Sequence, residues 1–164
     1  MRLKMLSSGK HELFLQMSFK EKVHAALLAV LSNDIQRLQQ SLGELRASAA
    51  NETKSTAGDK YETALAMLQT EKDNISKQLQ DLLRRRAIAE TLPLTLNKVI
   101  GNGSLVETDT AIFYISVAAG KIPIDNEIVF TISASSPLGQ KLFGLKKGEV
   151  AEINTRKYII KEVY

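Results

Sequence analysis

Large apolar residues recur along the first half of the chain at alternating intervals of three and four positions. A second run follows a stretch of small and polar residues. This spacing is typical of a coiled-coil seam. It predicts two long helices that fold back as an antiparallel hairpin over residues 18–91, with the tip near residues 47–60. The seam positions are Leu28, Leu31, Ile35, Leu38, Leu42, Leu45, Tyr61, Leu65, Leu68, Lys72, Ile75, Leu79 and Leu82, of which Lys72 alone is charged.

The first helix is expected to start near Phe19, because Ser18 and Glu21 have the spacing of a helix-capping pair. Residues 1–17 show no clean period and are interpreted as a poorly ordered leader, with Met17 as an alternative start. A helix of about 27–30 residues is about 40–45 Å long. Since two helices bury little surface, the hairpin needs a second folded body, and its tip is expected to lie far from that body.

The composition changes at Pro93, and residues 92–164 form a second predicted domain. All three prolines and six of the nine glycines lie after residue 92. β-Branched and aromatic residues predict strands over 111–117 and 127–132, a strand with a turn or bulge over 97–106, and a hairpin over 150–163. Ser136 and Pro137 predict a short helix that runs to Phe143. The fold class is therefore α+β, with a helical hairpin followed by a small, mostly antiparallel sheet of four or five strands.

Composition narrows the function classes. The chain has no cysteine, which excludes disulfides, thiolate zinc sites and a cysteine nucleophile. The net charge of +4 comes from mixed rather than striped charges, which disfavours direct nucleic-acid binding. No apolar stretch reaches the 18 residues of a membrane span, so no membrane association is expected and a cytoplasmic protein is the default.

The segment from Ser133 to Val150 resembles the C-terminal signature of the bacterial Gre family of transcript-cleavage elongation factors. The signature begins with Ser136-Pro137, continues through an aliphatic and a small residue, and ends with Gly144 and a Gly-acidic pair. Lys141 departs from it, since the family usually has a small residue there. The order of parts, a helical hairpin before a sheet domain similar to the FKBP fold, also resembles that family over residues 18–164.

The resemblance implies a regulator of transcription elongation that binds RNA polymerase through its secondary channel. The C-terminal domain would hold the rim of the channel, and the hairpin tip would reach the active site. Nascent RNA and DNA would be met only indirectly, within the polymerase complex. The chain would be a monomer without a cofactor of its own and not itself an enzyme, at most stimulating the intrinsic nuclease of the polymerase. The implied polymerase-binding residues are Ser136, Pro137, Leu138, Lys141, Lys146 and Lys147.

The predicted tip departs from the family pattern. Aligning the tip tyrosine with Tyr61 places Lys54 and Ala57 where the family has its paired acids. The nearby carboxylates Glu52, Asp59 and Glu62 are the remaining candidates, with Asp59 and Glu62 as possible ligands of an Mg²⁺ shared with the polymerase. Stimulation of transcript cleavage and modulation or inhibition without cleavage therefore both stay open.

Two further functions stay open. An FKBP-like domain suggests a peptidyl-prolyl isomerase, although the few aromatic residues after residue 92 are needed for the core. A coiled-coil adaptor would instead pair its helices between chains.

Overall fold

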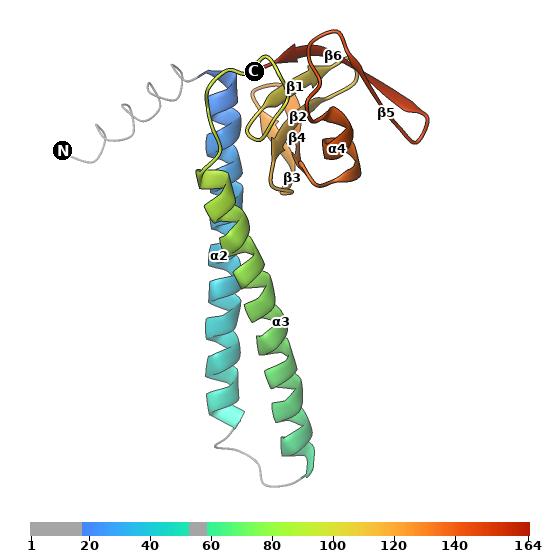
Figure 1. Cartoon of the computed structure of the whole chain (residues 1–164). Helices are drawn as coiled ribbons and strands as arrows, with labels where there is room; N and C mark the ends of the chain where they lie inside the picture. The colour runs from blue at the N-terminus through green and yellow to red at the C-terminus, as the bar shows by residue number, and fades with distance from the viewer. Residues whose placement is uncertain (1–17, 53–58) are drawn as a thin grey trace, which may run out of the picture. The chain divides into compact units, whose positions relative to one another are not determined.

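The computed structural model describes residues 18–52 and 59–164 (Figure 1). The predicted leader, 1–17, and part of the predicted tip, 53–58, lie outside the described residues. The chain divides into two compact units. One combines the described residues up to Ala29 with Ile88–Tyr164, and the other is Val30–Ala87. The division thus falls within both long helices rather than at Pro93, because the first turns of the first helix pack with the sheet.

Two long helices form the predicted hairpin. Helix α2 spans Phe19–Glu52 and helix α3 spans Asp59–Glu90. The predicted capping pair is present at the start of α2: the backbone N–H of Ser18 donates to Glu21 Oε2 at 2.7 Å, and the backbone N–H of Glu21 donates to Ser18 Oγ at 3.3 Å. With 34 and 32 residues, the helices are about 50 Å long at the usual rise of about 1.5 Å per residue.

The heptad seam lies between the two helices, as predicted. All described seam positions are buried or half-buried. Within Val30–Ala87, the buried residues among these positions are Leu31, Ile35, Leu42 and Ile75. Nearer the tip the seam opens into a groove of about 290 Å³, bordered by Leu45, Leu65, Leu68 and Lys72 among others. The one charged seam residue therefore coincides with the incompletely packed part of the seam.

A six-stranded sheet forms most of the other unit. Its strand order is β3-β4-β2-β1-β6-β5, and only the β2–β4 pair is parallel. The confirmed fold is α+β, a helical hairpin followed by a mostly antiparallel sheet with one short helix. The strands are β1 (Leu105–Thr108), β2 (Ile112–Ser116), β3 (Gly120–Ile124), β4 (Glu127–Ser133), β5 (Val150–Ile153) and β6 (Arg156–Val163).

Two details of the sheet differ from the sequence prediction. Strand β3 was not predicted, because Gly120 and Pro123 disfavour strand structure; it lies at the sheet edge, where proline is tolerated. The predicted strand over 97–106 is a turn followed by the start of β1. Gly103 has a φ of 80°, and an added Cβ would lie 2.6 Å from the carbonyl oxygen of Pro93, so the chain must turn there without a side chain.

One sheet face packs on the short helix α4 (Pro137–Leu142), which begins where the sequence predicted. The core on this side contains Phe113, whose ring lies 5.6 Å from that of Tyr158 and 5.9 Å from that of Phe130. These aromatic side chains are used in the core, as the composition led us to expect. Leu142 is fully buried in the same cluster.

The opposite sheet face meets the first turns of α2. His24 Nδ1 lies 2.9 Å from the hydroxyl oxygen of the buried Tyr114 on β2. Lys22 forms an ion pair with Asp125 in the β3–β4 turn at 3.2 Å. Val23 and Leu27 are fully buried on the same stretch of helix. No helix of the described chain is long and apolar enough to cross a membrane.

Candidate functional site

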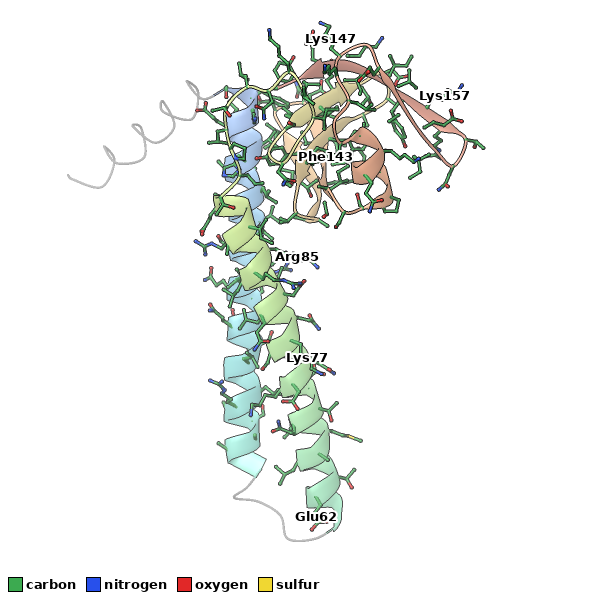
Figure 2. The ribbon with its side chains drawn as sticks, viewed as in Figure 1. Glu62, Lys77, Arg85, Phe143, Lys147 and Lys157 are labelled. Carbon is green, nitrogen blue, oxygen red and sulfur yellow. The ribbon has the colours of Figure 1, made fainter. Side chains whose placement is uncertain are left out.

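The candidate carboxylates of the tip lie at the two helix ends that the hairpin brings to the same end of its unit (Figure 1). Glu52 is the last residue of α2, and Asp59 is the first of α3. Glu62 follows in the first turn of α3 and is exposed to solvent (Figure 2). The side chains of Glu52 and Asp59 lie outside the described residues, so the convergence of the three carboxylates stays a prediction.

Binding of Mg²⁺ at this tip would depend on the oxygen donors that the tip supplies. Mg²⁺ prefers six oxygen ligands and is commonly held by one or two carboxylates, water and groups from a partner or substrate. Within residues 18–52 and 59–164, no group of three or more His, Cys, Asp or Glu side chains is placed to hold a metal ion. Glu62 is the single candidate acid whose side chain lies within the described residues, so binding of Mg²⁺ by the three carboxylates stays a prediction.

Ser136 and Pro137 start helix α4 through a well-formed cap. The Ser136 Oγ accepts a hydrogen bond from the backbone N–H of Gly139 at 3.1 Å and donates one to the carbonyl oxygen of Ser133 at 2.7 Å. Pro137 stands at the first helical position, where no backbone donor is required. The serine hydroxyl thus donates one hydrogen bond to the backbone and accepts one from it, which fixes the start of α4.

Gly139 is the small residue of the same motif, and the structure shows why it is small. An added Cβ would lie 2.1 Å from the carbonyl oxygen of Ser133 and 2.9 Å from Ser136 Oγ. Real Cβ atoms do not approach a backbone oxygen this closely. The helix can therefore lie against the end of β4 only when position 139 has no side chain.

Adjacent apolar residues at the end of α4 have opposite environments. Leu142 is fully buried, whereas Phe143 is 49% exposed (Figure 2). A six-residue helix buries one face, so only one of two neighbours can enter the core. Leu138 is half-buried against the core, and Pro137 is exposed. Phe143 is not among the binding residues predicted from the sequence; the pair of large apolar residues at the end of so short a helix is the signal that one of them faces solvent.

The three lysines selected from the sequence are all exposed side chains near α4 or the loop after it. Lys141 lies in the last turn of α4. Lys146 lies two residues after Gly144, and its backbone N–H donates to Glu149 Oε2 at 2.7 Å. Lys147 forms an ion pair with Glu162 on β6 (Figure 2). Phe143 and these three exposed lysines together are called the α4 surface below.

The arginines at the end of α3 have a local role. Arg84 and Arg85 both bind the carboxylate of Asp81, at 2.7 Å and 2.5 Å. Hydrogen bonding from Arg84 is the main reason that the pKa of Asp81 is lowered. Exposed pairs of this kind contribute little to stability, and this cluster resembles an ordinary solvated helix face.

His24 lies near the start of α2, where its Nδ1 contacts the hydroxyl of Tyr114. Burial, followed by the positive charge of Lys20, lowers the pKa of His24. Burial also raises the pKa of Tyr114 to about 12. Both shifts favour the neutral forms, which suits a buried contact that links helix α2 to the sheet.

No protein-family model and no curated protein matches the chain. Among solved structures, similar chains include GreA factor homolog 1 (Gfh1) of Thermus thermophilus, with 23% identity over 79% of this chain and 94% of that chain and a TM-score of 0.33. A structure described as the transcription factor Gfh1 has 21% identity over 85% of this chain and 94% of that one, with a TM-score of 0.34. Gfh1 of Thermus aquaticus has 22% identity, 79% and 92% coverage and a TM-score of 0.33.

Proposed function

We propose that this protein regulates transcription elongation by binding RNA polymerase through its secondary channel. The observation that carries the proposal is the combination, in one chain, of an antiparallel helical hairpin with a sheet unit whose Ser136-capped helix has the residues of the Gre signature. In that signature Ser136 is needed as a cap, Pro137 as a helix start and Gly139 for close packing.

The α4 surface is the proposed docking site for the rim of the channel. Exposed aromatic and cationic side chains fit a partner surface that combines an apolar pocket with acidic side chains. Phe143 would supply the buried anchor of this contact, and Lys141, Lys146 and Lys147 would supply electrostatic steering. A cytoplasmic location follows from the proposed partner.

The hairpin tip is the part proposed to act inside the channel. Glu62 and the helix ends at Glu52 and Asp59 would lie there, with Mg²⁺, if bound, shared with groups of the polymerase. Stimulation of RNA cleavage and modulation without cleavage differ only in whether these carboxylates bind the metal productively. The protein itself would not be an enzyme in either case.

The test uses RNA polymerase from the same organism, stalled and backtracked on a template with labelled RNA. We expect the protein to bind this complex as a monomer and Phe143→Ala to weaken binding by about tenfold or more, as for an aromatic anchor. Ile128→Ala, at a 53% exposed position on β4, is the matched control and should bind normally. Absence of binding, or equal loss in both variants, would refute the proposal.

The release of short 3′ RNA fragments in the same assay separates the two modes of action. If cleavage is stimulated, Asp59→Ala/Glu62→Ala should abolish it without loss of binding. Glu71→Ala changes an exposed acid of α3 outside the first turn and should cleave normally. Binding without cleavage by the unmodified protein would assign the modulator function. If the protein instead forms dimers through its helices and does not bind RNA polymerase, it is a coiled-coil adaptor.

A further inference from the structure

The turn before strand β1 contains the one asparagine of the chain that is followed by a glycine. Asn102 precedes Gly103, whereas every other asparagine is followed by a residue with a side chain. Asn102 is exposed to solvent. Because glycine has no Cβ, it leaves the main-chain nitrogen after the asparagine unshielded. The turn therefore places an accessible side-chain amide next to a main-chain nitrogen that can react with it.

An asparagine followed by glycine can lose its side-chain amide without an enzyme. The main-chain nitrogen of Gly103 would form a bond to Cγ of Asn102, the proton of its N–H would pass to the solvent, and ammonia would leave from Cγ. Water then opens the cyclic imide at either of its carbonyl groups. The product at position 102 is aspartate or isoaspartate, and isoaspartate carries the main chain through the former side chain.

In the folded protein a hydrogen bond holds the nitrogen that would react. The backbone N–H of Gly103 donates to the carbonyl oxygen of Ile115 on β2 at 2.7 Å, which keeps the proton on the nitrogen and directs it toward β2. Two further bonds close the turn. The backbone N–H of Ser104 donates to the carbonyl oxygen of Gly101 at 3.1 Å, and the backbone N–H of Gly101 donates to Oγ of the fully buried Ser104 at 3.0 Å. The reaction therefore requires this turn to open.

The surroundings of the turn do not suit the products. Asn102 borders a cavity of about 440 Å³ together with Thr91, Leu92 and Pro93, which follow the last residue of α3. A carboxylate at position 102 would lie near the carbonyl end of α3, where the helix dipole disfavours negative charge. An added Cβ at Gly103 would already lie 2.6 Å from the carbonyl oxygen of Pro93, so the longer main chain of isoaspartate would have to displace one of these residues. Modification would thus loosen the chain between α3 and β1.

We propose that Asn102 is a site of spontaneous deamidation, which the folded turn protects and whose product loosens the segment between α3 and β1. The modification accumulates with the time that the turn spends open, since local opening exposes the nitrogen of Gly103. The site shares no residue with the α4 surface or with the candidate acids of the tip, and it does not depend on the proposed function.

Peptide mapping by mass spectrometry tests the site. The full chain is kept at neutral pH, either folded or unfolded in urea, and the conversion of amide to acid is read from the mass of each asparagine-containing peptide. In urea, Asn102 should deamidate faster than Asn97, Asn126 and Asn154. In the folded protein, the rate at Asn102 should be lower by about tenfold or more. Equal rates at Asn102 in the two states would overturn the protection, and a rate in urea no faster than at the other asparagines would overturn the site.

Two variants distinguish opening of the turn from unfolding of the whole sheet unit. Ser104→Ala removes the Oγ that holds Gly101 and should raise the rate at Asn102 in the folded protein by about fivefold. Thr131→Ala is the matched control, because it also removes a buried hydroxyl that forms two hydrogen bonds to the backbone, at Ala119 and Gly120. It should leave the rate unchanged. No acceleration by Ser104→Ala, or equal acceleration by both variants, would refute local protection by the turn.

Asn102→Asp tests the effect of the product. Amide hydrogen exchange at Gly103 and Ser104 should be about two- to fivefold faster in this variant than in the unmodified protein, because the new charge lies near the end of α3. Asn102→Gln changes the side chain at the same position without adding charge and should exchange at the unmodified rate. Equal exchange rates in Asn102→Asp and Asn102→Gln would overturn the proposed loosening.

Discussion

Replacing Gly139 by alanine sets two physical effects against each other. Inside a helix, alanine is normally favoured over glycine by about 1 kcal/mol, because glycine loses more backbone freedom on folding. At Gly139, however, the new Cβ would meet the carbonyl oxygen of Ser133 at 2.1 Å, and Ser136 Oγ and the Cα of Ala134 at 2.9 Å and 3.0 Å. Two of these three atoms are backbone atoms, so the clash cannot be relieved by a side-chain rotation.

The magnitude follows from the parts that must move. Forcing an extra carbon into a packed site costs about 1–3 kcal/mol. Displacing α4 from Ser133 also weakens the cap, which is worth about 1 kcal/mol. After subtracting the helix preference of alanine, we expect Gly139→Ala to lower the free energy of unfolding of the sheet unit by about 1–3 kcal/mol.

Gly43→Ala is the matched control, since Gly43 lies inside α2 with nothing within 4 Å of an added Cβ. This variant should be stabilised by up to about 1 kcal/mol. Urea unfolding would be followed by tyrosine fluorescence, which reports mainly on the sheet unit because it holds three of the four tyrosines, and by far-ultraviolet circular dichroism, which reports mainly on the helices. A raised fluorescence midpoint for Gly139→Ala would refute the inference that this position must lack a side chain.

Two further predictions concern His24 and Lys72. Burial and the charge of Lys20 lower the pKa of His24 in the folded protein, so as the pH falls the histidine takes up a proton in the unfolded chain before it does so in the folded one. The contribution of His24 to the free energy of unfolding is therefore fully present above the ordinary histidine pKa of 6.5 and should decrease as the pH falls below that value. His24→Gln should reduce this slope in unfolding experiments between about pH 5 and 7, and an unchanged slope would contradict the assignment. Lys72→Leu should fill the open part of the seam and stabilise the hairpin by about 1 kcal/mol, since a half-buried leucine gains about half of its full transfer energy. Lys77→Leu, at an exposed position off the seam (Figure 2), should have little effect, and an equal midpoint for the two variants in circular dichroism would contradict the role of the seam.

The helical hairpin could be predicted in detail from the sequence, because its packing depends on local periodicity. Alternating steps of three and four residues fix which face is buried, and the Ser18–Glu21 pair fixes where α2 begins. The helix at Pro137 was equally readable, since its cap involves neighbours in the chain. The sequence was therefore sufficient to predict those elements whose structure depends on residues close together in the chain.

The sheet unit was less predictable because its details depend on contacts between distant residues. Strand β3, with its Gly120 and Pro123, is accepted only because it pairs with β4 at an edge. The burial of Lys20 and His24 depends on residues about 75 and 90 positions away. No local pattern distinguishes these two from other polar residues on a helix, so their burial had no signal in the sequence.

The strand order has a consequence for the order in which the protein is made. Strand β1 pairs with β6, so the sheet is incomplete until the last strand has left the ribosome. Val23 and Leu27, which are fully buried in the same unit, are synthesised more than a hundred residues earlier. During translation these side chains have no complete sheet to cover them, while the hairpin seam can close as soon as α3 emerges. The start of α2 is therefore the stretch of the nascent chain that would need protection for longest.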